Sequence, residues 1–205
     1  VRFDKKLEDR IVFCTKNRFG TTDEVCILTM EQDGLHVAQS SHQLIEEPGT
    51  VFTLFEQKNN LEAIAIQSSI AYYALGKLDC NFYSSKELSK VASIFAQMEM
   101  PVRRWHINVA ALGYQGKVKD ADAELGIYAS ILAAHTEHKP EVKIAALGSV
   151  SLTGNVLPCK REEERISLAL SMGFDKVIGN FVSSRQDSRI VRVQTVRGIV
   201  KNLSF

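Results

Sequence analysis

Two cations separated by a single residue are the first feature of the chain that could carry chemistry. Lys16 and Arg18 lie in the segment KNRFG, on a short connection between two apolar runs. In an extended segment, residues two apart point to the same side, so both cations can approach one phosphate group. We assign Asn17, Phe19 and Gly20 to shaping the turn. A solvated basic turn is the alternative interpretation of the same residues.

A nucleotide would need a second element, because cations alone do not cradle a triphosphate. A phosphate-binding loop has the pattern G-x-x-x-x-G-K-[ST], in which backbone amides and a lysine hold the phosphates. The segment that comes nearest to this pattern is GYQGKVK (113–119). It has the wrong spacing and places Val118 where the magnesium-binding hydroxyl belongs. We therefore expect the chain alone to hydrolyse no ATP.

The composition is that of an ordinary globular chain. It has 205 residues, 45% of them hydrophobic, and a formal net charge of +1, which argues against a generally basic nucleic-acid binder. Four scattered cysteines, Cys14, Cys26, Cys80 and Cys159, form no C-x-x-C pair, so we expect reduced thiols, no metal site and a cytoplasmic location. No apolar run is long enough for a membrane helix.

The elements that must position these residues are read from periodicity and from turn signals. Strand-like runs are 10–14, 25–30, a short run after Asp33-Gly34, 50–57, 61–73, 103–112, a hairpin-like pair in 143–158, 175–180 and 189–193. Helical runs are 84–100, 119–138, 160–174 and a short one at the end of the chain. The pattern predicts an α/β fold with a mixed sheet (α+β in its hairpins), and the helix 119–138 carries an apolar stripe through Leu125, Tyr128 and Leu132.

Two stretches resemble known families. The stretch LGSVSLTGNVLPCKREEERISLALSMGFDKVIGN (147–180) is similar to the end of the Lon protease domain in the order and spacing of its L-T-G-x-V-x-P hairpin, helix and strand. The segment KNRFG followed by TTDEVCILTMEQDGL resembles the signature of the RadA (Sms) family of bacterial recombination ATPases, which carry a Lon-like domain. The region 72–104 departs from that family pattern.

The resemblance implies a domain division and a role for the cations. Residues 1–47 would be the last strands of a RecA-like ATPase core, and 48–205 a non-proteolytic Lon-like domain that scaffolds a ring, with a hexamer as the expected homo-oligomer. Lys16 and Arg18 would reach the γ-phosphate of ATP, with Mg²⁺, in a neighbouring subunit. Because the chain opens on Val1 with a polar segment, we expect a fragment whose phosphate loop lies upstream. DNA, and the RecA recombinase, would be its partners.

The resemblance to Lon proteases also raises the question of whether this chain is a peptidase. Lon proteases use a serine nucleophile and a lysine base, and these positions fall at or beside Glu124 and Glu163. Two carboxylates cannot replace a hydroxyl nucleophile and an amine base. We therefore expect no peptidase activity. A Lon-like peptidase with a relocated nucleophile, Ser151 or Ser130, stays open as an alternative.

Basic residues outside the KNRFG segment are candidates for DNA contact. They are Arg103, Arg104, Lys160, Arg161, Arg189, Arg192, Arg197 and Lys201. Phosphate contacts of this kind give affinity without sequence specificity. The low aromatic content, with one tryptophan, offers no recognisable stacking platform for single strands. Solvated surface positions, or a purely structural oligomerisation module, remain the alternatives.

Overall fold

The computed structural model divides the chain into two compact units, 1–44 and 45–205. It describes residues 9–13, 25–31, 34–37, 48–72, 76–83, 85–112, 114, 116–136 and 142–203. This division lies three residues before the expected boundary between residues 47 and 48, and the identity of each domain stays a prediction. None of the helices in these ranges is long and apolar enough to span a membrane.

The first unit contains a three-stranded antiparallel sheet in the order β1-β2-β3. The strands are β1 (Asp9–Phe13), β2 (Val25–Glu31) and β3 (Gly34–Val37). All three were expected from their apolar runs, and β1 and β2 pair from Asp9↔Thr29 to Phe13↔Val25. The KNRFG segment between β1 and β2, with Lys16 and Arg18, lies outside the described residues.

The second unit is built on a seven-stranded mixed sheet in the order β12-β11-β8-β4-β5-β7-β6. Its strands are β4 (Thr50–Gln57), β5 (Asn60–Tyr72), β6 (Lys77–Cys80), β7 (Trp105–Leu112), β8 (Ile144–Leu147), β11 (Lys176–Gly179) and β12 (Ile190–Arg192). β4, β5 and β7 run antiparallel, whereas β4-β8-β11-β12 and β6-β7 are parallel pairs. This confirms the α/β class with a mixed sheet.

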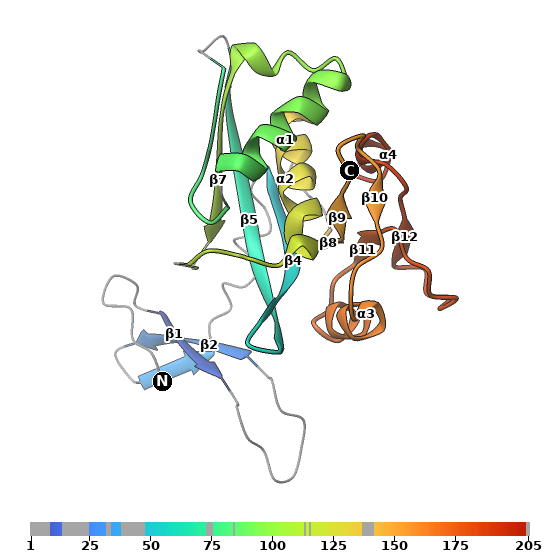
Figure 1. The fold of residues 1–205 in the computed structure, drawn as a ribbon. Helices are drawn as coiled ribbons and strands as arrows, with labels where there is room; N and C mark the ends of the chain where they lie inside the picture. Colours follow the sequence, from blue (N-terminus) through green and yellow to red (C-terminus); the bar gives the residue numbers. More distant parts are fainter. Residues whose placement is uncertain are drawn as a thin grey trace. The chain divides into compact units, whose positions relative to one another are not determined.

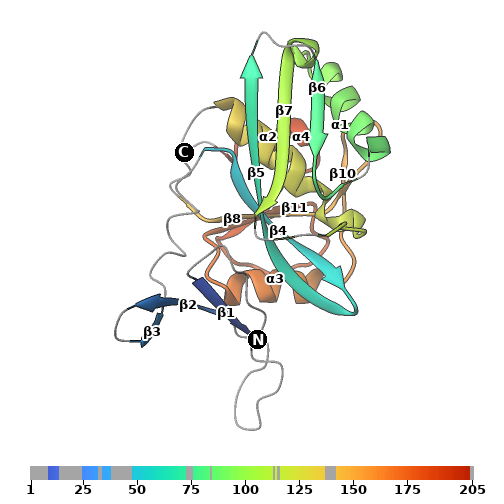
Figure 2. The ribbon, with the colours of Figure 1, turned by 90° about the vertical axis from the view of Figure 1, so that its left-hand side faces the viewer.

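A long hairpin of β4 and β5 lies in the middle of that sheet (Figure 2). β4 pairs with β5 from Thr50↔Gln67 to Gln57↔Asn60. Lys58 and Asn59 between them both have positive φ, 51° and 69°, as a type I′ turn requires, so a two-residue turn joins the strand runs expected at 50–57 and 61–73. The structure differs from the prediction of a hairpin-like pair of strands in 143–158. β8 joins the large sheet instead, and only the short strands β9 (Ser149–Val150) and β10 (Val156–Leu157) form a hairpin.

Helices cover both faces of the sheet (Figure 1). They are α1 (Ser85–Gln97), α2 (Glu124–Thr136), α3 (Glu162–Ser171) and α4 (Val196–Val200), with short 3₁₀ turns at Val102–Arg104 and Ala121–Ala123. Side chains of α1, α2 and α4 share one hydrophobic core, and those of α3 share a second core. β4 serves both cores, because Val51 and Phe55 face the first and Leu54 faces the second.

Helix α2 is the centre of the first core, and its environment differs from the predicted one. Every residue from Glu124 to Ala133 is buried, so the helix has no solvent face of the kind an apolar stripe implies. The sheet covers one side and α1 another, with the Phe95 and Tyr128 rings 5.5 Å apart. At Gly126 a Cβ atom would lie 2.9 Å from the Thr53 Cβ, so glycine lets α2 approach β4 closely.

Candidate functional site

The start of α2 is where the Lon resemblance places the nucleophile, and a buried ion pair occupies it. Glu124, 3% exposed, accepts a hydrogen bond from the Val150 backbone N–H at 3.0 Å. The Lys90 Nζ of α1 lies 2.5 Å from its other carboxylate oxygen and donates to the Val150 carbonyl at 2.8 Å. The Lys90 ammonium group and both Glu124 oxygens therefore hold α1, α2 and β9 together.

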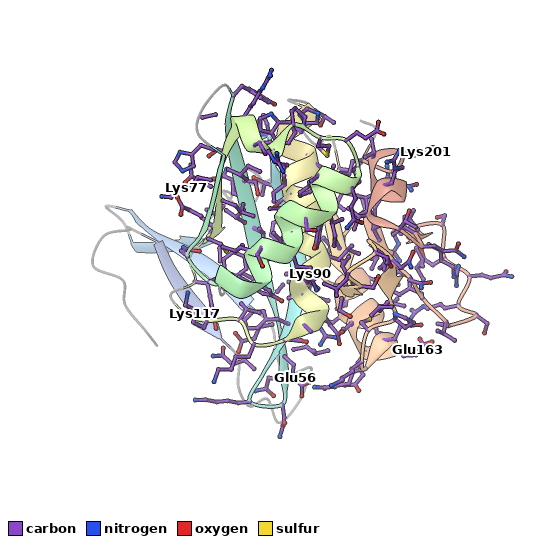
Figure 3. The ribbon with its side chains drawn as sticks, turned by 45° about the horizontal axis from the view of Figure 1, so that its top comes forward. Glu56, Lys77, Lys90, Lys117, Glu163 and Lys201 are labelled. Carbon is purple, nitrogen blue, oxygen red and sulfur yellow. The ribbon has the colours of Figure 1, made fainter. Side chains whose placement is uncertain are left out.

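This arrangement does not reproduce an acid–base pair. Glu163, at the position of the lysine base, is exposed on α3, whereas Glu124 is sealed in the core. Figure 3 shows Lys90 on α1 and Glu163 on the separate helix α3. Lys90 is an amine beside the site, but its neighbour is a carboxylate that cannot act as a hydroxyl nucleophile. The ion pair and hydrogen bond at Glu124 therefore have a structural role, in which they link α1, α2 and β9.

A second buried charge network borders the same helix start. Arg165, 0% exposed, lies 2.5 Å from the Asp120 carboxylate and 3.7 Å from that of Asp122. It also donates to the carbonyls of Leu54 at 2.5 Å and Lys160 at 2.9 Å. The guanidinium group thus joins α3 to β4 and to the turn that begins α2.

The two aspartates respond differently to this surrounding. Burial acts to raise the pKa of Asp120, but hydrogen bonds from Arg165 and from the Glu56 and Asp122 backbone N–H groups outweigh burial, so the pKa is lowered. Burial raises the pKa of Asp122, and its hydrogen bond from the Lys160 N–H offsets only part of that effect. Asp120 is therefore the principal carboxylate partner of Arg165.

Sequence reasoning singled out neither Lys90 nor Arg165. A signal for Arg165 exists, since it lies four residues before Ala169 on the helix face that also carries Ile166 and Leu170, all of them buried. A cation on an apolar helix face needs a buried partner. Lys90 gives no comparable signal, because only the fold brings α1 beside α2.

The two serines of the peptidase alternative are both engaged in structure. Ser130 is 0% exposed and donates to the Ile127 carbonyl, and its Oγ lies 2.7 Å from that of Ser68. The Ser151 Oγ accepts hydrogen bonds from the Thr153 and Asn155 N–H groups and so shapes the β9–β10 turn. In the described contacts neither serine has a basic partner, which argues against a relocated nucleophile.

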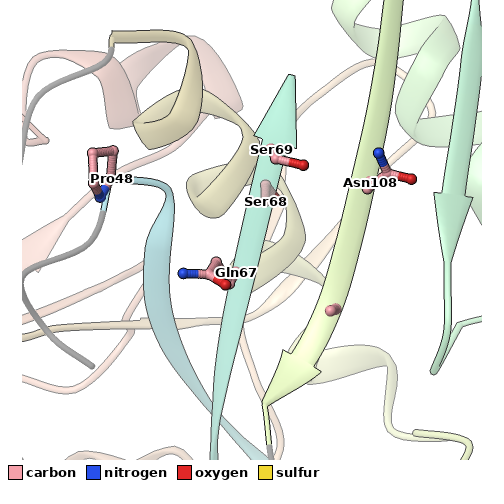
Figure 4. Close-up of a pocket in the computed structure, with 6 residues that line it drawn as sticks. Pro48, Gln67, Ser68, Ser69 and Asn108 are labelled. Atoms are coloured by element: carbon pink, nitrogen blue, oxygen red, sulfur yellow. The ribbon is translucent and has the colours of Figure 1, made fainter. Parts of the chain in front are cut away.

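A shallow pocket of about 340 Å³ lies on the β5–β7 face and is drawn in Figure 4. Its lining residues are Pro48, Gln67, Ser68, Ser69, Asn108 and Ala110. None of these six side chains carries a charge, and no group of three or more metal-ligating side chains occurs in the described ranges. The pocket therefore offers neither an acid–base pair nor a cation for a phosphate.

Two candidate DNA-contact residues lie at the start of α3. Arg161 is held by three partners: it lies 2.5 Å from the Glu164 carboxylate and 3.3 Å from that of Glu56, and it donates to the Asn59 carbonyl at 3.0 Å. These contacts leave little of its charge available for a phosphate. Lys160 is exposed, and its backbone rather than its side chain is tied down.

Two further candidates, Arg189 and Arg192, lie directly before β12 and at its last position. Arg189 forms a two-point pair with Asp187 at 3.0 and 2.9 Å, and its hydrogen bonds lower the Asp187 pKa to about 2. Arg192 donates to the Ser183 carbonyl at 2.5 Å. Both arginines thus stabilise the connection between β11 and β12.

The remaining candidates lie elsewhere on the unit. Arg103 and Arg104 are exposed at the start of β7, next to the edge strand β6, and β12 is the opposite edge of the sheet. Arg197 and Lys201 are exposed at α4. Figure 3 shows Lys201 and the β6 residue Lys77 on opposite sides of the unit. The eight cations therefore form no single patch.

Comparison with known proteins identifies the family. No model of a known protein family matches the chain. The chain is 30% identical over 183 residues to the DNA repair protein RadA of Helicobacter pylori strain J99, covering 85% of this chain and 41% of that protein. It is 29% identical over 178 residues to RadA of Bacillus subtilis strain 168, covering 82% and 39%. With RadA of Streptococcus pyogenes serotype M3 it shares 27% over 206 residues, covering 94% and 45%.

The chain spans less than half the length of these curated relatives, whereas the matches cover most of the chain itself. They extend well beyond the KNRFG and L-T-G-x-V-x-P motifs that first suggested the relationship. The chain therefore belongs to the RadA family of DNA repair proteins.

Proposed function

We propose that the chain is the Lon-like, non-proteolytic part of a RadA-type DNA repair ATPase, preceded by the last strands of the RecA-like core. The Lon-like part, 48–205, scaffolds a ring, expected to be a hexamer, and contacts DNA. The observation that carries this proposal is the match to several RadA proteins over most of the chain. The buried pair of Lys90 and Glu124, where a protease would need its nucleophile, supports a scaffolding role.

Within this proposal, KNRFG acts between subunits. Lys16 and Arg18 approach the γ-phosphate of ATP and its Mg²⁺, which the neighbouring subunit holds on a phosphate loop outside this chain. Cations that meet the phosphate only when the ring closes stabilise the charge that develops during phosphoryl transfer. Hydrolysis is thereby coupled to assembly and to movement on recombination intermediates, single-stranded or branched. The RecA recombinase is the proposed protein partner in the bacterial cytoplasm.

The intersubunit role is tested in the full-length protein. Lys16→Ala and Arg18→Ala should each lower DNA-stimulated ATP turnover by roughly a thousandfold, the scale of a missing arginine finger, while ATP binding is kept. Lys5→Ala removes the same charge from the same unit and serves as the matched control. Wild-type turnover in both KNRFG variants would contradict the assignment.

A second experiment addresses the 205-residue chain itself. It should show no labelling by a serine-directed fluorophosphonate and no casein cleavage, and it should bind labelled DNA with an affinity that falls steeply with salt. Labelling that disappears in Ser151→Ala or Ser130→Ala would instead support the peptidase. Normal oligomerisation without any DNA binding would favour the purely structural module.

A further inference from the structure

The end of the sheet nearest the carboxyl end of α2 gathers three aromatic rings that are far apart in sequence. Tyr72 ends β5, Trp105 begins β7, and His135 lies in the last turn of α2. The Trp105 ring centroid is 4.7 Å from that of His135 and 5.8 Å from that of Tyr72, whose hydroxyl lies 3.4 Å from the His135 Nδ1. Figures 1 and 2 show that the end of β5, the start of β7 and the end of α2 lie at the same end of the unit.

The three rings differ in their exposure to solvent. Trp105 is only 2% exposed and forms the floor of the cluster. Tyr72 is half-buried, and His135 is exposed. An aromatic surface on a rigid floor is the kind of platform on which a nucleic-acid base stacks.

Two cations stand beside these rings. Arg103 and Arg104 directly precede Trp105, and both are exposed. The described contacts include no ion pair and no side-chain hydrogen bond for either guanidinium group, in contrast to Arg161 and Arg189. These two arginines therefore keep their charge available for an incoming phosphate.

The described acidic residues near this site do not pair with the two arginines. Lys77 is neutralised by Asp79 at 2.7 Å, and the same carboxylate accepts from His106 at 3.1 Å. Along the chain, the exposed Glu99 lies four residues before Arg103, and Glu137 follows His135 by two residues. The described ion pairs include none between an acidic residue and Arg103 or Arg104, so both guanidinium groups keep their positive charge.

We propose that Tyr72, His135, Arg103 and Arg104, here called the Tyr72 platform, bind single-stranded nucleic acid. A base stacks on Tyr72 and His135 while the flanking phosphates meet the two arginines. The inference rests on the proposed DNA contact of the chain and assigns it a place. Aromatic faces take up unstacked bases, which single strands present and an intact duplex does not.

The test compares two pairs of cations that carry equal charge. Fluorescein-labelled oligo(dT) of 20 nucleotides and a matched 20-base-pair duplex are titrated by anisotropy with wild type, Arg103→Gln/Arg104→Gln and the control Arg197→Gln/Lys201→Gln on α4. The platform variant should bind oligo(dT) at least about tenfold more weakly and lose about 1.4 from the slope of log K against log salt, because each single-strand phosphate contact contributes about 0.7. The α4 control should bind as wild type does.

The stacking of a base on the aromatic rings is tested with a variant that leaves the net charge of the protein unchanged. Tyr72→Leu keeps an apolar side chain against Trp105 and should weaken oligo(dT) binding roughly 5- to 150-fold with an unchanged salt slope, the range that one base–aromatic stack supports. His135→Ala, at an exposed position, gives the same readout if the Tyr72 variant does not fold. Trp105 is the sole tryptophan, so its emission should change on binding oligo(dT) and stay constant in the platform variant.

The outcomes separate this inference from the proposed function. DNA binding that is lost in the α4 control but kept in the platform variant overturns the Tyr72 platform while the DNA contact stands. Equal affinity for oligo(dT) and duplex, with no effect of Tyr72→Leu or His135→Ala, also overturns it. A wild-type chain that binds neither DNA refutes the DNA contact and the platform together.

Discussion

Replacing Arg165 by methionine should be among the most damaging single changes in the second unit. The guanidinium group is fully buried and joins Asp120 at 2.5 Å to the Leu54 carbonyl at 2.5 Å and the Lys160 carbonyl at 2.9 Å. Methionine fills similar space but leaves a buried carboxylate and two carbonyls without their donor. Removing one partner of a buried pair costs about 3–5 kcal/mol.

That free energy is large enough to measure in this protein. With a urea m-value of about 2 kcal/mol/M, the unfolding midpoint should fall by roughly 1.5–2.5 M, and Tm by roughly 6–20 °C. Trp105, the sole tryptophan, lies in the core of the second unit, so its fluorescence reports the unfolding of that unit. Arg161→Met, four residues earlier and only half-buried, is the matched control and should shift the midpoint far less.

The pH dependence provides a second readout. In the wild type the Asp120 pKa is lowered, so its contribution to stability is present above its unfolded pKa near 4 and is lost as pH falls through the lower folded value. Without Arg165 the buried carboxylate has a raised pKa, so protonation relieves the penalty as pH falls. The difference between variant and wild type should therefore be largest at pH 7 and shrink toward pH 4.

Two results would refute this reasoning. One is a midpoint for Arg165→Met that matches that of Arg161→Met at pH 7. The other is a loss of stability that stays constant between pH 7 and pH 4, because a cavity without a stranded charge would produce that behaviour. Adding Asp120→Asn to Arg165→Met should recover part of the loss if the stranded carboxylate is its source.

Three further predictions concern the same unit. Lys90→Met should lower the free energy of unfolding by about 2–3 kcal/mol, because it strands the carboxylate of Glu124, and adding Glu124→Gln should restore part of it; urea unfolding of the single and double variants measures this. Burial raises the pKa of Cys159 to about 12, so at pH 8 its thiol should resist maleimide in the folded protein and react in urea, as peptide mass spectrometry would show. Gly126→Val should cost about 1–3 kcal/mol by overpacking α2 against β4, whereas Gly198→Ala on α4, where a Cβ meets nothing closer than 3.5 Å, should leave the thermal midpoint nearly unchanged.

Local signals in the sequence predicted most elements of this fold. The two strands of the β4–β5 hairpin and the helix that ends before Pro101 follow from turn chemistry and periodicity. β6 was missed, because four residues with a charged first and third position carry too little pattern to stand out. The placement of β8 between β4 and β11 also could not be predicted, since it depends on contacts between distant segments.

For the candidate site too, the sequence predicted some features, whereas others depend on contacts between distant segments. The Lon resemblance placed the protease dyad at Glu124 and Glu163, whose residue types argue against it, and the structure adds the partners that hold Glu124. Sequence reasoning found no stacking platform because its members come from three elements, and Tyr72 and His135 are 63 residues apart. Only the fold brings them together beside Trp105. The role of Lys16 and Arg18 stays a prediction, because they lie outside the described residues.

The position of β8 in the sheet has a consequence for how the chain is made. The buried Thr53 hydroxyl of β4 donates to the Ala146 carbonyl of β8, 93 residues later in the chain. At a synthesis rate of 5–20 residues per second, β4 waits roughly 5–20 s on the ribosome before its partner strand exists. During that interval the nascent chain presents an open strand edge of the kind that templates aggregation. The second unit therefore completes its sheet only after β8, β11 and β12 have been synthesised, and until then the free edge of β4 has no partner strand.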